Sequence, residues 1–150
     1  MSDTQPQRAS LERVSAEFRI YSGDIDAAEV SARLGIFATT SLRRGGSITT
    51  SLGRTRVHKL NGWFLSSEFE VPSNDPEDHL AWLVGKLAST TAALPALLAC
   101  PGVKAMVVCT CWTTNAGASV PIASATMRAL ADLGVDLHIA FSSYEDEKAS

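Results

Sequence analysis

AEFRIYSGDIDAAEVSARLGI, residues Ala16–Ile36, is the stretch that defines the start of the fold. In its first third, apolar side chains alternate with polar ones, and the apolar set is Ala16, Phe18 and Ile20. This period of two predicts a strand with one buried face. The remaining residues carry the start and stop signals of a short helix, so the stretch predicts a strand followed directly by a helix.

The helix in this stretch is bounded by residues with capping chemistry. Gly23-Asp24 turns the chain, and Asp26 can accept a hydrogen bond from the first helical turn. Glu29 follows three residues later, as in a capping box. Gly35 can adopt the left-handed conformation that commonly ends a helix. The helix is therefore expected between Asp26 and Gly35.

Further strands are predicted along the rest of the chain. Between residues 39 and 60 the pattern is weak, with short strands possible at 48–52 and 55–60, so the number and order of strands there stay open. Clear alternation or a run that is apolar on both faces predicts three more strands, at residues 63–71, 103–113 and 135–141.

Two further helices are expected. The first begins at Asp75-Pro76, because proline is tolerated and acidic side chains are favourable in a first helical turn. Pro95 is expected to end or kink it. The second covers residues 121–133 and stops at Gly134. The apolar stripe of the first of these helices is Leu80, Leu83, Val84 and Leu87.

The order of these elements predicts an α+β fold, a mixed sheet with helices mainly on one face. The most specific form of this prediction is a ferredoxin-like βαββαβ core with an added helix and strand. We expect a flexible N-terminal tail at residues 1–12, a single domain at residues 13–144 and an acidic C-terminal tail at residues 145–150.

Composition limits the class of protein. The chain has 150 residues with 13 basic and 16 acidic side chains, a net charge of −3 that makes nucleic acid an unlikely general partner. The N-terminus has no signal-peptide pattern, and the apolar stretch at residues 92–100 is too short to span a bilayer. We therefore expect a cytoplasmic protein without a membrane partner. Its three cysteines are expected to be free thiols.

The segment from Val30 to Ser67 contains no Asp or Glu, although the protein is acidic overall. Arginine can donate two parallel hydrogen bonds to a carboxylate or phosphate, so this segment predicts a site for a small anionic ligand or for an acidic surface on a partner. The alternative is an ordinary basic hairpin whose charges pair with Glu68, Glu70 or the acidic tail. The candidate binding residues are Arg43, Arg44, Arg54, Arg56, Lys59 and Trp63.

Other possible sites are weaker. Cys109 and Cys111 point to one side of a strand and are best interpreted as small hydrophobic residues of the core, because no metal-ligand spacing accompanies them. Ser67 is the residue most like a nucleophile, but a packed side chain with a hydrogen bond is the favoured explanation. No catalytic motif is present, so we expect no catalytic residues, no metal and no cofactor.

The predicted central strand at residues 103–113 is apolar on both faces, whereas the helices cover one face only. Part of its apolar surface would then be exposed, as is common at an interface with a second copy or another protein. The candidate interface residues are Met106, Val108 and Trp112.

By its motifs the chain resembles a bacterial family known as domain of unknown function 4279. The resemblance rests on short motifs in a shared order, among them FRIY at residues 18–21, GDID at 23–26, GWFLSS at 62–67 and LADLGVDL at 130–137. It extends over roughly residues 14–144. One departure is Phe37-Ala38-Thr39, where other members usually have a proline before the threonine. The resemblance implies the fold and a bacterial origin, and it implies no activity.

These observations favour a non-enzymatic binding or interaction domain, of immunity or regulatory type, that recognises an anionic ligand or an acidic partner. One alternative is a small enzyme whose anionic substrate is held by Arg54, Arg56 and Lys59. Another is a single-strand nucleic-acid binder that uses Tyr21, Trp63 or Trp112 as stacking platforms. A pocket that gathers the arginines around a titratable group would favour the enzyme, and a flat surface would favour the interaction domain.

Overall fold

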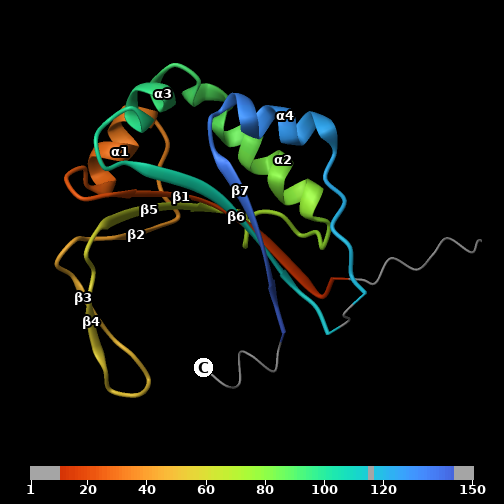
Figure 1. The fold of residues 1–150 in the computed structure, drawn as a ribbon, viewed down its shortest axis with the longest axis horizontal. Coiled ribbons are helices and arrows are strands. Elements are labelled where there is room, and N and C mark those ends of the chain that lie inside the picture. Colours follow the sequence, from red (N-terminus) through yellow and green to blue (C-terminus); the bar gives the residue numbers. More distant parts are fainter. Residues whose placement is uncertain (1–10, 115–116, 144–150) are drawn as a thin grey trace, which may run out of the picture.

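The computed structural model describes residues 11–114 and 117–143 and is built around a five-stranded sheet in the order β2-β5-β1-β6-β7 (Figure 1). β1 pairs antiparallel with both β5 and β6, β2 pairs antiparallel with β5, and β7 runs parallel to β6. The sheet is therefore mixed, as predicted. Its strands are β1 (Arg13–Ser22), β2 (Thr40–Leu42), β5 (Asn61–Ser66), β6 (Lys104–Trp112) and β7 (Asp136–Ser142).

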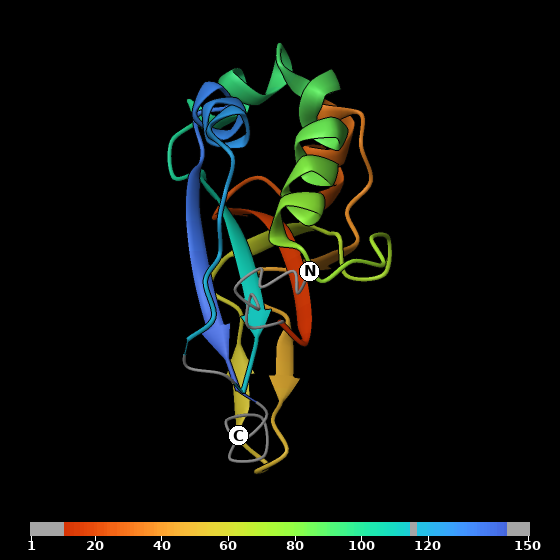
Figure 2. The same cartoon turned by 90° about the vertical axis from the view of Figure 1, so that its right-hand side faces the viewer.

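All helices of the described chain lie over one face of this sheet, as Figures 1 and 2 show. The predicted α+β architecture with helices on one face is confirmed. The ferredoxin-like detail stays a prediction, although β1 does lie between β5 and β6 in the sheet. The helices are α1 (Ala27–Leu34), α2 (Pro76–Leu87), the 3-10 turn η1 (Ala88–Thr90), α3 (Ala93–Leu98) and α4 (Ser124–Asp132).

The weakly patterned segment between residues 39 and 60 contains three short strands. β2 joins the main sheet, while β3 (Ser47–Thr49) and β4 (Thr55–Val57) pair only with each other. The two form a hairpin that projects from the body of the molecule, away from the helices (Figure 1). The two short strands predicted here correspond to β3 and β4, with shorter bounds than expected, whereas β2 was not predicted.

β1 holds the core together because every second side chain points toward the helices. Val14, Ala16, Phe18, Ile20 and Ser22 are buried, and the residues between them are half-buried on the other face. Opposite them on the same side lie the buried side chains of the neighbouring strands and of the helix stripe, including Leu65, Val107, Leu80, Leu83 and Leu87. This is the core that the alternating sequence predicts.

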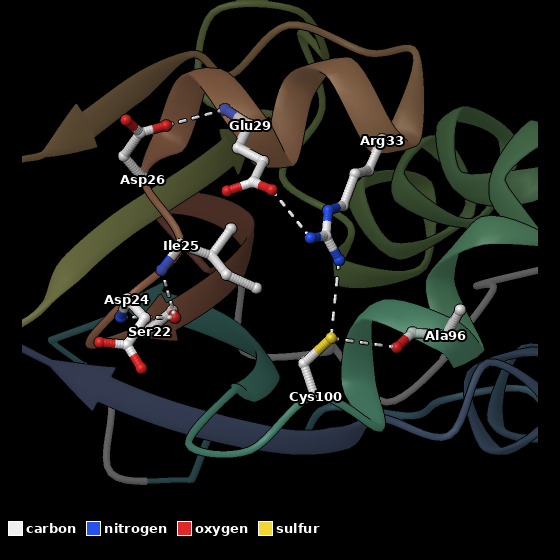
Figure 3. Close-up of polar contacts among 8 residues, drawn as sticks. All are labelled: Ser22, Asp24, Ile25, Asp26, Glu29, Arg33, Ala96 and Cys100. Carbon is white, nitrogen blue, oxygen red and sulfur yellow. Dashed lines mark hydrogen bonds and ion pairs between the residues drawn. The ribbon is translucent and has the colours of Figure 1, made fainter.

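The capping chemistry around α1 is as expected (Figure 3). The Asp26 carboxylate accepts a hydrogen bond from the Glu29 amide at 2.9 Å, and Gly35 ends the helix with a φ of 72°. The Glu29 side chain is used differently from a capping box, because it binds Arg33 one turn later at 2.8 Å. Ser22 Oγ accepts from the Ile25 amide at 3.0 Å, which fixes the turn between β1 and α1.

Three predicted elements are wrong in their extent, and one of them is the helix expected at 121–133, which begins at Ser124. The strand expected at 63–71 ends at Ser66, because the chain turns at Ser67, whose carbonyl accepts the amides of Glu70 and Val71. Phe69 is consequently 88% exposed instead of buried. The long helix ends at Leu87, before Pro95. Pro95 lies in the first turn of α3, where its missing N–H would have no partner within the helix in any case.

No helix within the described ranges is long and apolar enough to cross a membrane.

Leu83 tests the predicted stripe of α2, since its side chain is fully buried against the core. We expect Leu83→Ala to lower the free energy of unfolding by about 2–5 kcal/mol, because the truncated side chain leaves a cavity. Denaturant melts measure the change, with exposed Ala81→Ser on the same helix as the control. A change below about 0.5 kcal/mol would show that this face of the helix contributes little.

Candidate functional site

The projecting segment, residues 43–60, is named here the basic hairpin. Its ladder is longer than the two strands, because the Gly45 amide donates to the His58 carbonyl at 2.9 Å and the Thr50 amide donates to the Arg54 carbonyl at 2.8 Å. Gly53 takes a φ of 75° at the tip, a conformation that favours glycine. The hydrogen bonds give the hairpin a defined shape despite its distance from the core.

Four of the predicted binding residues are exposed along this hairpin: Arg43, Arg54, Arg56 and Lys59. None of them forms an ion pair with any acid in the described ranges. Arg54 and Arg56 are two residues apart on the same arm, so their side chains leave from one face of the ladder. Within the described ranges, no ion pair therefore neutralises their charges.

Arg44 has a different role from the one predicted. Its guanidinium donates to the Gly23 carbonyl at 3.0 Å and lies 3.9 Å from the Asp24 carboxylate. Its amide donates to the Asn61 side chain at 2.8 Å. These contacts fasten the base of the basic hairpin to the turn that follows β1. Arg44 thus positions the hairpin.

The basic hairpin also carries exposed apolar side chains, between 43% and 82% exposed. They are interspersed with the cationic residues in the sequence, so the surface is both apolar and positive. Grouped exposed apolar residues commonly mark a contact surface. The four are Ile48, Leu52, Val57 and Leu60.

Trp63 is not part of this surface, which corrects its prediction as a binding residue. It is 1% exposed, packs edge-on against Phe18 and donates from Nε1 to Ser31 Oγ at 2.9 Å. The alternation that predicted a buried face on this strand already placed Trp63 there. Its indole links β5 to α1 and is out of reach of a ligand at the surface.

The alternative explanation for the basic segment, pairing with Glu68 or Glu70, is not observed. Glu68 forms its ion pair with Arg13 of β1. No described ion pair joins Glu70 to the basic hairpin. The acidic tail, the third partner considered, lies outside the described residues.

The face of the sheet without helices carries the predicted interface residues. Met106, Val108 and Trp112 are half-buried there on β6. The Arg13 guanidinium lies 4.4 Å from the centre of the Trp112 ring. Tyr21 packs edge-on against Phe64 on the same face. This open face is therefore a mixture of apolar and charged groups, and one ring face of Trp112 is already covered.

The family model described as Domain of unknown function (DUF4279) matches residues 12–144. The chain belongs to this family. No curated protein and no solved structure matches the chain. The resemblance seen in the sequence is thereby confirmed, and the family description carries no activity.

The DUF4279 domain contains a buried serine–histidine pair that the sequence did not reveal. Ser67 Oγ lies 2.6 Å from His79 Nδ1, and His79 Nε2 lies 2.6 Å from the Ser73 carbonyl. A carbonyl only accepts, so Nε2 donates and Nδ1 accepts the serine proton. Ser67 Oγ also accepts the Ala16 amide at 2.9 Å. Every polar atom is satisfied, and both side chains are buried.

This pair has the components of a nucleophile and a base, but its surroundings make it structural. Ser67 is 0% exposed and His79 is 1% exposed, so no substrate reaches the hydroxyl. The contact ties the end of β5 to β1 and α2. It was missed because Ser67 and His79 lie 12 residues apart with no motif between them.

Cys109 and Cys111 lie side by side on the buried face of β6, as predicted. A hydrogen bond with Cys111, together with burial, raises the pKa of the Cys109 thiol above its ordinary value. The Cys109 thiol therefore stays protonated at neutral pH. A cysteine that binds a metal or acts as a nucleophile must instead be a thiolate. Within the described ranges, no group of three or more His, Cys, Asp or Glu side chains could hold a metal ion.

A shallow groove of about 690 Å³ lies between α2 and the segment that follows α1. It is lined by Trp82 and Lys86 of α2, by Glu70 and by Phe37, which is 88% exposed. Thr39 fixes the edge of this groove, since its amide donates to the Phe64 carbonyl at 2.7 Å and its hydroxyl accepts the Ser66 amide. The segment with the unusual Phe37-Ala38-Thr39 sequence thus forms one wall.

Ser67→Ala tests the structural role of the buried pair. Removing the hydroxyl leaves the Ala16 amide and His79 Nδ1 without partners in the core, so we expect a loss of about 1–3 kcal/mol in the free energy of unfolding. Denaturant melts measure it, and Ser89→Ala at an exposed position is the control. An unchanged stability would contradict the hydrogen-bond arrangement described above.

Chelator and reductant test the interpretation of the cysteines. We expect EDTA and dithiothreitol to leave the thermal midpoint unchanged, because Cys109 and Cys111 act as buried thiols. Elemental analysis is expected to find no stoichiometric zinc. One zinc ion per chain whose removal unfolds the protein would overturn this interpretation.

Proposed function

We propose that this protein is a non-enzymatic binding domain that holds an acidic surface of a partner protein with its basic hairpin. The observation that supports this most directly is the gathering of Arg43, Arg54, Arg56 and Lys59 on a projecting hairpin without ion pairs in the described chain.

The basic hairpin is positively charged in a protein that is acidic overall. Because the net charge of the chain is −3, the positive potential of the basic hairpin is local. A local patch steers a partner of opposite charge and fixes its orientation, more than it adds affinity. Because these exposed cations form no ion pair in the described chain, no ion pair has to be broken when the partner binds. The basic hairpin is thus suited to carboxylates on another molecule.

The apolar residues indicate that the partner is a protein. A small anion would use the arginines and leave Ile48, Leu52 and Val57 in water. A protein surface covers both kinds of side chain, because interfaces combine apolar contacts with a polar, charged rim. The projecting shape of the hairpin, seen in Figure 1, allows a partner to contact both of its faces.

The enzyme alternative has less support. The arginines lie along the outside of the basic hairpin instead of gathering in a pocket around a titratable group. The groove beside α2 is lined by Lys86 and Glu70 and includes none of the arginines of the hairpin. The serine–histidine pair is enclosed in the core. The groove has a cation and a carboxylate, Lys86 and Glu70, but it contains none of the arginines that were expected to hold an anionic substrate.

Nucleic acid is also less well supported. Of the three stacking platforms considered, Trp63 is buried, Tyr21 packs against Phe64 and Trp112 is covered on one ring face by Arg13. Binding of single strands depends strongly on such exposed rings. The charge alone would give weak, salt-sensitive binding without sequence preference.

The double variant Arg54→Ala/Arg56→Ala tests this function. The probe is a fluorescent peptide that alternates Glu or Asp with Leu or Phe, measured by anisotropy at moderate salt. We expect its affinity to fall about tenfold or more, a change of about 1.4 kcal/mol. The thermal midpoint should stay the same, because both side chains are exposed. Lys86→Ala/Lys104→Ala removes two exposed charges elsewhere and should leave binding unchanged.

A second pair of measurements separates the kinds of ligand. Leu52→Ser/Val57→Ser should weaken the same peptide several-fold, whereas a small anion or an oligonucleotide would not respond to the loss of apolar side chains. An oligothymidine that binds more tightly than the peptide, and equally well to this variant, would contradict the proposal. Equal peptide binding by the wild type and the arginine variant would contradict it as well.

A further inference from the structure

The last strand of the sheet, β7, has a free edge. It pairs with β6 on one side, and no strand of the described chain pairs with its other side. Figures 1 and 2 show β7 at the margin of the sheet, with α4 as the helix nearest to it and the second half of the strand extending beyond α4. An unpaired edge presents a row of backbone donors and acceptors to any strand that fits.

This edge lacks the features that usually protect a free strand. Its sequence, DLHIAFS at residues 136–142, contains no lysine, proline or glycine, and its register with β6 is continuous, without a bulge. Ile139 is 40% exposed and Phe141 is 56% exposed. The opposite edge strand, β2, differs because it has only three residues. The β7 edge is therefore the edge suited to accept another strand.

We propose that β7 pairs antiparallel with β7 of a second copy of this chain, across a two-fold axis at Ile139. Aligning the whole strand with itself places residues 136 and 142 opposite each other and makes Ile139 its own partner. Leu137 then lies opposite Phe141, which gives a continuous apolar row on the helix side. No charged residue faces a like charge in this register, since Asp136 meets Ser142 and His138 meets Ala140.

The position of α4 supports a second copy as the occupant. α4 lies near the start of β7, and the second half of the strand extends beyond it (Figures 1 and 2). A two-fold axis at Ile139 therefore places the two α4 helices at opposite ends of the paired strands, where they do not collide. Phe141, in the half of β7 beyond α4, is 56% exposed, and in this register Leu137 of the second copy lies next to it. A second copy thus covers an apolar side chain that α4 leaves exposed.

This interface is independent of the proposed function. It uses the edge of the sheet at β7, whereas the proposed binding surface is the basic hairpin between β2 and β5. The result would be a ten-stranded sheet with the helices of both copies on one face. The basic hairpins and the open face would stay accessible to other partners.

Light scattering on the full chain tests the assembly. We expect the wild type to have twice the mass of one chain at high concentration. Ile139→Lys should yield monomers, because it sets two lysines against each other at the axis. Leu52→Lys adds the same charge at an exposed position of the basic hairpin and should remain a dimer. A monomeric wild type, or a dimer that survives Ile139→Lys, would overturn the proposal.

Cysteine cross-linking tests the register itself, in a Cys100→Ser/Cys109→Ala background, because Cys109 of β6 lies opposite Ile139 and could otherwise form a disulfide within one chain. Ile139→Cys opposes its own symmetry mate at a Cα separation of about 5 Å, within the range of a disulfide. We expect it to form a covalent dimer under mild oxidation. Ala140→Cys is the matched control, since its Cα would lie about 8 Å from its mate, which is too far. Cross-linking of the control but not of Ile139→Cys would exclude this register even if a dimer exists.

Discussion

Strand β1 pairs with β6 over residues 13–21 and with β5 over residues 17–22, and this double pairing determines where the rest of the chain lies. Because side chains alternate, one face of β1 is apolar and must be covered. The helices that follow β1, β5 and β6 all cross that same face (Figure 2). A shift of one residue in either pairing would turn Phe18 and Ile20 toward water, so the register of β1 is fixed by the core.

One-sided coverage explains why the surface has such different regions. The helices bury one face of the sheet, and the other face is covered by its own mixture of half-buried apolar and charged side chains, such as Val108 and Arg19. The basic hairpin is an insertion between β2 and β5 that contributes nothing to the core. It can therefore carry exposed arginines and apolar residues at little cost to stability, as binding surfaces on loops and hairpins commonly do.

The buried polar contacts connect helices and strands whose relative positions hydrophobic packing alone would define less uniquely. Ser67 and His79 join the end of β5 to α2, and Trp63 joins β5 to α1 through Ser31. A buried polar group without a partner is costly, so these contacts favour one arrangement of helices over its neighbours. The same enclosure removes Ser67 from chemistry and Trp63 from ligand binding.

The sequence by itself determined the strand–helix start, the buried stripe of α2, the one-sided α+β architecture and the family, because local periodicity and capping act between residues close in the chain. It also located the basic segment, since a run without acids is visible without a structure. Only the tertiary structure decided that Trp63 is buried, that Arg44 fastens the hairpin, that the strand stops at Ser66 and that no other strand of the described chain pairs with the outer side of β7. These depend on contacts between residues far apart in the chain, and no local pattern encodes which neighbour a strand or a side chain will meet.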